Sequence, residues 1–194
     1  MSRPRNILAT WAAVLVLGCA FSIAQMASNS SSAKPSASDQ TFMKQAAQGN
    51  EAEVALGQLA QQKAESPDVK AFGERMVNDH TMANDELKQV ASEKGVSLPS
   101  RPNAEGTAEK ARLEKMSGAQ FDKAYMNYMV AEHKKDVAGF QKEATHANDP
   151  AVKNFAQITL PTLQSHLQEA ESIAPKQKAA TSKASTTASN SNPR

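Results

Sequence analysis

Four stretches of this sequence carry apolar residues at three- and four-residue spacing, which is the period of an amphipathic helix. They predict long helices over about 41–64, 67–95, 118–147 and 150–174, with a short helix near 104–115. Two of the starts carry a polar cap followed by proline, in "SPD" and "NDP", and Asp39 is the candidate cap of the first helix. Aromatic residues are only 5% of the chain. We therefore expect an all-α protein.

One polar residue interrupts each apolar stripe near its middle. These residues are Glu53, His80, His133 and His166, one on each long helix. If the chain turns near residues 65 and 148, each residue's distance from its turn follows from the helical rise of roughly 1.5 Å per residue. Glu53 and His80 then lie within about one helical turn of the same distance from the first turn, and His133 and His166 likewise from the second. The pattern predicts that all four side chains point inward and meet in one layer.

Three neutral imidazoles and a carboxylate are ligands that one Zn²⁺, Fe²⁺, Mn²⁺ or Cu²⁺ ion accepts, and bundle interiors hold such sites. The set Glu53, His80, His133 and His166 is therefore the candidate metal site. A second interpretation stays open, in which the same layer only satisfies its own hydrogen bonds and sets the helix packing. Acidic neighbours that could support or extend the site are Asp79, Glu132, Asp136 and Glu169, of which Asp136 and Glu169 are the best placed.

A faint internal repeat organises residues 41–174. "PDVKAFGERM" from Pro67 matches "PAVKNFAQIT" from Pro150, and "QTFMKQA" from Gln40 loosely matches "AQFDKAY" from Ala119. Each half then forms one helical hairpin, and the proline-containing stretch "VSLPSRPNAEG" joins the halves. This predicts an antiparallel four-helix bundle of the ferritin-like type.

The two ends of the chain differ in composition from this central part. Residues 1–24 combine Arg3 and Arg5 with the apolar run "ILATWAAVLVLG", as an export signal does. Two alternatives stay open: an uncleaved membrane anchor, for which the apolar run is only marginally long, and a lipoprotein signal that ends before Cys19, the single cysteine, in "VLGC". Residues 25–40 form a Ser-rich flexible linker, and 175–194 a basic disordered tail. The expected location is periplasmic or anchored at the outer membrane, with envelope association through the N-terminus.

Charge and motifs narrow the function classes. Residues 41–174 hold fifteen Lys and Arg against nineteen Asp and Glu, a net charge of −4, which argues against nucleic-acid binding. The sequence shows no nucleophile triad order, phosphate-binding glycine loop or dinucleotide motif. We therefore expect a non-enzymatic binding or protective envelope protein with a mononuclear metal site. The alternatives are a structural or adhesive protein without metal, and a metal-dependent oxidoreductase.

Three segments resemble a known family: "FMKQAAQGNEAEVALGQLA", "VKAFGERMVNDHTMANDELK" and "FAQITLPTLQSHLQEA". They are similar to the exported bacterial proteins of domain-of-unknown-function family 4142, over roughly residues 40–173. The resemblance implies a ferritin-like bundle and export, and no established reaction. Di-iron bundles place Glu three residues before His, whereas this chain has Val77, Val130 and Leu163 at those positions. A ferroxidase centre is therefore not expected.

Overall fold

The computed structural model of the chain describes residues 34–187, with side chains described for 34–174. The described part is all-helical, with five helices and no strand, as predicted. The predicted signal, the lipid-anchor alternative at Cys19 and most of the predicted linker lie outside the described residues. The helices are α1 (Ala37–Lys63), α2 (Pro67–Glu93), α3 (Ala104–Leu113), α4 (Gly118–His146) and α5 (Pro150–Thr187).

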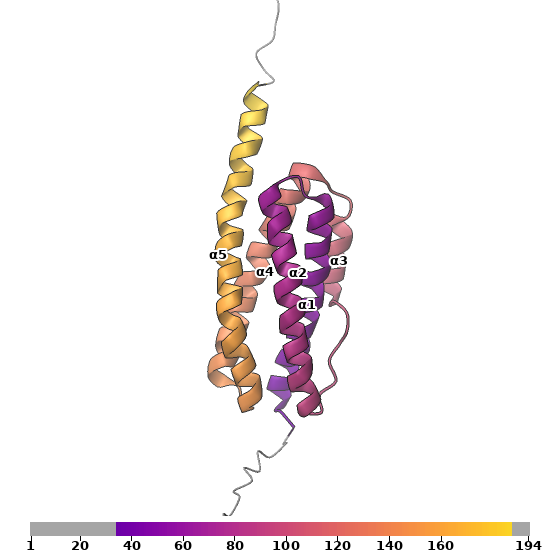
Figure 1. Cartoon of the computed structure of the whole chain (residues 1–194), viewed down its shortest axis with the longest axis vertical. Coiled ribbons are helices and arrows are strands. Elements are labelled where there is room, and N and C mark those ends of the chain that lie inside the picture. The colour runs from indigo at the N-terminus through magenta and orange to yellow at the C-terminus, as the bar shows by residue number, and fades with distance from the viewer. Residues whose placement is uncertain (1–33, 188–194) are drawn as a thin grey trace, which may run out of the picture. The chain divides into compact units, whose positions relative to one another are not determined.

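The five helices pack side by side into a bundle (Figure 1). α1 packs along α2, and α4 packs along α5. α2 also contacts α5, α1 contacts α4, and the short α3 lies against α1 and α4. Buried apolar side chains form two clusters, one around Phe72 and Tyr125 and the other around Phe140 and Phe155. Along α4, His133 falls between these two clusters.

The starts of α1 and α5 show how short polar side chains set helix ends. Ser36 caps α1 by accepting a hydrogen bond from the backbone N–H of Asp39 at 3.2 Å. The prediction that Asp39 is the cap was therefore wrong, because the serine three residues earlier takes that role. Asp149 caps α5 as "NDP" predicted, accepting from the N–H groups of Ala151 at 2.8 Å and Val152 at 3.3 Å.

Helix α5 continues past Ala174, where the sequence predicted its end, to Thr187. The segment 175–187 is therefore helical, in contrast to the predicted disordered tail. Alanine and lysine are common in this segment, and both have high helix propensity, so the helix can continue without tertiary support from an apolar stripe. Residues 188–194 lie outside the described part of the chain.

Two glycines allow α1 and α2 to approach closely. A Cβ atom on Gly57 would lie 2.5 Å from the backbone oxygen of Gly73. A Cβ atom on Gly73 would lie 2.8 Å from the Cβ of Ala60. Both separations are far shorter than a van der Waals contact. The crossing of these two helices therefore depends on the absence of side chains at both positions.

A buried aspartate ties the start of α4 to the turn between α1 and α2. Asp122 is only 1% exposed, and its two carboxylate oxygens accept from the backbone N–H groups of Glu65 at 3.1 Å and Ser66 at 2.9 Å. These N–H groups lie between helices and have no partner in a helical ladder. The contact fastens one hairpin to the other.

A second buried aspartate makes the equivalent contact at the turn between α4 and α5. Asp39 of α1, also 1% exposed, accepts from the N–H groups of Asn148 at 3.4 Å and Asp149 at 2.8 Å, between α4 and α5. Asp39 precedes Asp122 by 83 positions, the same separation as Pro67 and Pro150. The two hairpins therefore repeat at 83 residues, whereas the "QTFMKQA" match implies 79 and does not follow this register.

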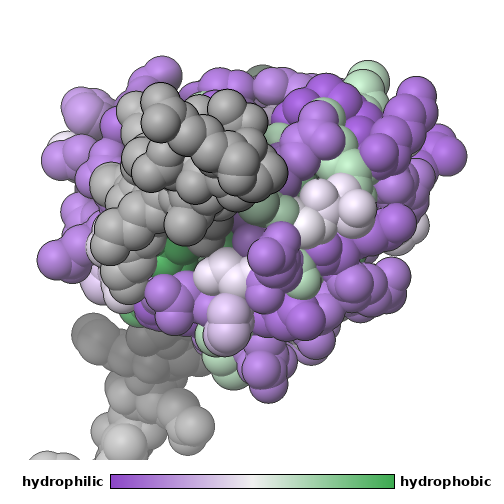
Figure 2. Space-filling view, turned by 90° about the horizontal axis from the view of Figure 1, so that it is seen from above, coloured by the Kyte–Doolittle hydropathy of each residue, from purple (hydrophilic) through white to green (hydrophobic). Residues whose placement is uncertain are grey.

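The exterior carries few apolar side chains. Seen from above, the surface that is coloured by hydropathy is mostly hydrophilic (Figure 2). Among the described residues, Met82 and Ile158 are the large hydrophobic side chains that are exposed, at 59% and 53%. None of the helices in the described range is both long and apolar enough to cross a membrane.

Candidate metal centre

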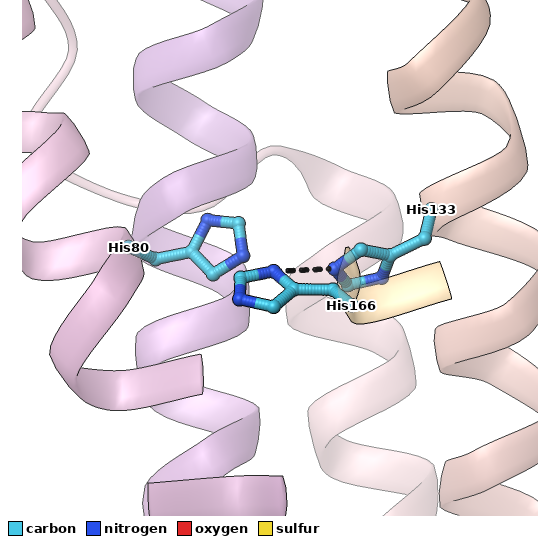
Figure 3. A group of neighbouring side chains, drawn as sticks. All are labelled: His80, His133 and His166. Atoms are coloured by element: carbon cyan, nitrogen blue, oxygen red, sulfur yellow. Dashed lines mark hydrogen bonds between the residues drawn. The ribbon is translucent and has the colours of Figure 1, made fainter. Parts of the chain in front are cut away.

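Three histidines from three helices converge in the interior (Figure 3). His80 comes from α2, His133 from α4 and His166 from α5, and they are 3%, 0% and 0% exposed. Each offers one ring nitrogen, and the three nitrogens lie within 4.8 Å of one another. The structure thus brings together the three imidazoles that the apolar stripes had placed on inner faces.

Glu53 of α1 lies against two of these rings. Its Oε2 atom is 2.8 Å from Nε2 of His80, and its Oε1 atom is 3.4 Å from Nδ1 of His133. Glu53 does not belong to the group of atoms that are mutually within 4.8 Å, which contains only the histidines. Burial alone would raise the pKa of Glu53, but the charges of His80 and His133 outweigh it and lower the pKa to about 2.

Asn50 lies on α1, one helical turn before Glu53, and also contacts His80. Its Oδ1 atom lies 2.9 Å from Nδ1 of His80. Burial would lower the pKa of His80, but the neighbouring Glu53 carboxylate outweighs it and raises the pKa. Sequence reasoning missed Asn50, although it lies three residues before Glu53 and therefore on the same helix face.

The tautomers of the other two histidines follow from their partners. Nδ1 of His133 lies 3.0 Å from the carbonyl oxygen of Met129, which can only accept, so Nδ1 carries the proton. Nε2 of His166 lies 2.7 Å from Oδ2 of Asp79, so that nitrogen carries the proton. In the neutral rings, Nε2 of His133 and Nδ1 of His166 therefore both present lone pairs.

These two lone-pair nitrogens face each other at 3.3 Å, along the dashed line in Figure 3. A hydrogen bond between them requires a third proton, which would make one ring an imidazolium. Burial lowers the pKa of His133 and lowers that of His166 to about 4, so both rings are neutral at neutral pH. The two inner nitrogens can therefore share a cation, either a proton at low pH or a metal ion.

A chain of charged groups holds His166 from outside. Asp79 accepts from the Nε–H of Arg75 at 3.2 Å in addition to the bond from His166. Arg75 also donates to Glu169 and, at 3.0 Å, to the hydroxyl of Ser165. Asp79 thus takes the supporting role predicted for an acidic neighbour, while Glu169 binds arginine and does not touch a histidine. Sequence reasoning missed Arg75.

The charged groups around His166 also connect the site to the surface. The Asp79 side chain is 22% exposed, although the imidazole that it holds is fully buried. Arg75 and Asp79 line a cleft of about 230 Å³ on the face formed by α2 and α5. Solvent therefore reaches the carboxylate that orients His166.

The remaining acidic candidates lie in different surroundings. Glu132 pairs with Lys135 at 2.6 Å, and the Lys135 side chain is 59% exposed, which places this pair at the surface. Asp136 is half-buried, and burial together with the negative charge of Glu53 raises its pKa to about 8. Asp136 therefore shares the electrostatic environment of the site with Asp79 and Glu132.

Several buried polar atoms around the histidines have no hydrogen-bond partner. They include Nδ2 of Asn50, Oε1 of Glu53, Nε2 of His80 and the hydroxyl of Tyr125. The 2.8 Å contact between Glu53 and His80 is an ion pair by distance and lacks the alignment of a hydrogen bond. Unpaired buried groups of this kind cost about 1–3 kcal/mol each. Such a cluster fits a site that receives a cation.

Residues 24–173 match a family described as "Domain of unknown function (DUF4142)". The chain belongs to this family. The DUF4142 match covers α1 to α4 and most of α5, including all three histidines and Glu53. It confirms the resemblance seen in the sequence. No curated protein matches the sequence.

Two solved structures share the fold of this DUF4142 chain. A DUF305 fragment from Deinococcus radiodurans superposes with a TM-score of 0.65 at 14% identity, covering 74% of this chain and 99% of that one. A DUF305 protein from Streptomyces coelicolor, described provisionally as secreted, gives 0.61 at 12% identity, covering 72% and 93%. At these identities the likeness concerns the helical fold alone.

Proposed function

We propose that this DUF4142 protein is an exported cell-envelope protein that binds one transition-metal ion inside its bundle. The ligands are His80, His133 and His166, with Glu53 as the anionic ligand beside them. The four long helices are proposed to form an antiparallel, ferritin-like bundle around this site. The protein's role is to bind the metal, in a protective or stress-related setting, without a reaction of its own.

The facing nitrogens of His133 and His166 are the observation that carries this proposal. Their opposite ring nitrogens donate to a carbonyl and a carboxylate, so the inner nitrogens are both free to accept. Two nitrogens bound to one tetrahedral zinc ion at about 2.0–2.1 Å would lie roughly 3.3 Å apart. The observed separation is 3.3 Å. A metal ion between the rings would therefore need little rearrangement of the two side chains.

The supporting contacts are those that metal-binding histidines use. A ligating imidazole commonly donates its second N–H to a carbonyl or carboxylate, which fixes its tautomer. Met129 and Asp79 provide these two acceptors here. The three imidazoles and the carboxylate suit Zn²⁺, Fe²⁺, Mn²⁺ or Cu²⁺. A bound ion would offset the unpaired polar atoms of Glu53 and His80.

Export is supported by the sequence of the first 24 residues. Arg3 and Arg5 precede an apolar segment of the length that signal peptides use. We propose a periplasmic location, or anchoring at the outer membrane through Cys19. Mass spectrometry of the mature N-terminus distinguishes the two, because a lipoprotein would begin at an acylated Cys19. A mature protein that retains residue 1 would contradict both.

The metal proposal is tested on untagged mature protein. Elemental analysis should find one transition-metal ion per chain, and the chelator-treated protein should take up Zn²⁺ at one site. His133→Ala should abolish this binding. His146→Ala is the matched control, because His146 lies on the same helix and is exposed. Wild-type protein that binds no transition metal, or His133→Ala protein that binds normally, would contradict the proposal.

A structural role without metal is the second candidate, and the ion pair between Glu53 and His80 favours it. At 2.8 Å these groups already neutralise each other inside the bundle. In that case one shared proton would join His133 and His166, and the layer would only set the packing of the helices. Chelator treatment discriminates the two functions. It should lower the melting temperature of a metal protein and leave that of a structural bundle unchanged.

A further inference from the structure

The four side chains of the site have almost no contact with solvent of their own. Glu53, His80, His133 and His166 are 5%, 3%, 0% and 0% exposed at their side chains. A metal ion therefore reaches this layer only where the bundle opens for it. The groups that hold the histidines from outside show where such an opening lies.

In the part of the chain that the structure describes, each histidine is held by one partner from outside the site. These partners are Asn50 for His80, the carbonyl of Met129 for His133, and Asp79 for His166. Asn50 and Met129 are buried, at 5% and 0% exposed. The Asp79 side chain is 22% exposed. Asp79 is therefore the partner through which the site meets solvent.

The surface at Asp79 is the cleft between α2 and α5. Its charged lining residues are Arg75, Asp79 and Glu86, which are two carboxylates against one guanidinium. This excess of negative charge attracts a cation from solution. Larger clefts lie between α3 and α4 and between α1 and α4, but none of their lining residues hydrogen-bonds to a site histidine within the described range. The cleft between α2 and α5 thus differs from them by its direct link to His166.

Arg75 bridges α2 and α5 beside this link. Oδ2 of Asp79 accepts from Nε of Arg75 at 3.2 Å and from Nε2 of His166 at 2.7 Å. Arg75 also donates to Ser165 and Glu169 on α5. The guanidinium therefore joins the two helices and places a positive charge next to Asp79, which repels an arriving cation. Oδ1 of Asp79 accepts no hydrogen bond from a described residue and is available to a cation.

We infer that the metal ion enters and leaves through this cleft, with Asp79 as its first contact and the Arg75 bridge as the contact that opens. This inference rests on the proposed metal site and adds the route by which that site is filled. Asp79 takes the ion from solution, and His166 is the first imidazole that the ion meets, because it is bonded to that carboxylate. The bonds from Arg75 to α5 break for the passage and form again behind the ion.

Kinetics separates an entry route from a ligand. A substitution that obstructs the route changes the association and dissociation rate constants by the same factor, because it leaves the free and the bound states as they were. The dissociation constant is the ratio of these two rate constants and therefore stays the same. Loss of a ligand acts mainly on the dissociation rate constant and weakens the affinity.

The obstructing variant is Ala83→Trp, because Ala83 is a half-buried residue in the lining of the cleft. Ala71→Trp is its matched control, since Ala71 is exposed on the same helix and does not line the cleft. Stopped-flow mixing measures Zn²⁺ uptake by chelator-treated mature protein and Zn²⁺ release into excess chelator. Ala83→Trp should slow both by about tenfold or more at unchanged affinity, and Ala71→Trp should match wild type.

The opening variant is Arg75→Gln, which removes the positive charge and the bridge to α5. It should accelerate Zn²⁺ uptake and release by about tenfold or more. Lys88→Gln makes the same change of charge at an exposed position on α2 and should leave both rates near those of wild type. This pair decides the question on its own if Ala83→Trp does not fold, which circular dichroism verifies for each variant.

The outcomes separate the entry route from the proposed function. Wild-type protein that binds Zn²⁺ at the histidines, with rates that neither Ala83→Trp nor Arg75→Gln alters relative to its control, would overturn the route and leave the site standing. An Ala83→Trp protein with weakened affinity and an unchanged association rate would overturn the route as well. Wild-type protein that binds no transition metal would overturn both proposals.

Discussion

At the scale of single residues, the partner atom decides what each buried histidine can do. His80 lies against a carboxylate, which stabilises its protonated form. His166 also holds a carboxylate, but its burial and the nearby imidazoles outweigh that contact and favour its neutral form. The surroundings therefore favour the protonated imidazole at His80 on α2 and the neutral imidazole at His166 on α5.

The low pKa of His166 predicts that the stability of the folded protein depends on pH. Its pKa is about 4 in the folded protein against 6.5 in the unfolded chain, so the unfolded chain binds more protons between these values. In metal-free protein its contribution to stability should fall as pH drops from 6.5 to 4, by on the order of 1 kcal/mol per pH unit. Urea denaturation at pH 7 and pH 4.5 measures the loss.

His166→Gln is the comparison, because glutamine keeps a donor for Asp79 and does not titrate. His80 acts in the opposite direction, since its raised pKa gives stability below pH 6.5 that is lost as pH rises through the folded value. Glu53 acts at lower pH, between 4.5 and about 2. Wild type should therefore lose more stability than His166→Gln between pH 7 and 4.5. Equal losses would contradict the assignment.

The periodicity of the sequence predicted the side and depth of the polar residues better than their partners. Helical spacing and distance from the turns suffice to bring His80, His133 and His166 to one layer. Helical spacing does not predict that Glu169 forms an ion pair with Arg75, because that contact depends on rotamers and on the packing of α2 against α5. Asn50 was missed because an amide on a helix face carries no charge signal.

At the scale of elements, helix starts were predictable where a proline stands at the first helical position, although the Ser66 side chain makes no capping hydrogen bond to α2. α2 and α5 begin at Pro67 and Pro150, as expected. The start of α1 was set by Ser36, which serine-rich surroundings made hard to distinguish from a linker. The far end of α5 was missed because high intrinsic propensity extends a helix that no apolar stripe marks.

The crossing of α1 and α2 gives a prediction with a built-in control. Gly57→Ala would place a Cβ atom 2.5 Å from the backbone of Gly73, so the helices must separate, at a cost of about 1–3 kcal/mol. Gly49→Ala lies in the same helix with nothing within 4 Å and should stabilise by roughly 0.5–1 kcal/mol through helix propensity. Thermal and urea unfolding measure both. A neutral or stabilising Gly57→Ala would contradict this close approach.

At the scale of the whole molecule, the two hairpins hold each other through their turns. Each hairpin supplies an aspartate from its first helix to the backbone of the other hairpin's turn. The polar layer lies between these two ends, so both contacts set how α1 and α4 face each other. The internal repeat that the sequence showed only faintly is thus a repeat of tertiary contacts.

Asp39 and Asp122 lie at opposite ends of the bundle, roughly 40 Å apart along α1. Asp39→Asn and Asp122→Asn should each lower the free energy of unfolding by about 1–2 kcal/mol, because each weakens two hydrogen bonds from buried N–H groups to a carboxylate. At this distance the two losses should add within about 0.5 kcal/mol in the double variant. Urea denaturation of the four proteins completes the cycle, with the exposed Asp85→Asn as a control. Since two-state unfolding requires both hairpins to be lost together, a double variant that unfolds in two separate transitions would show that they are independent units.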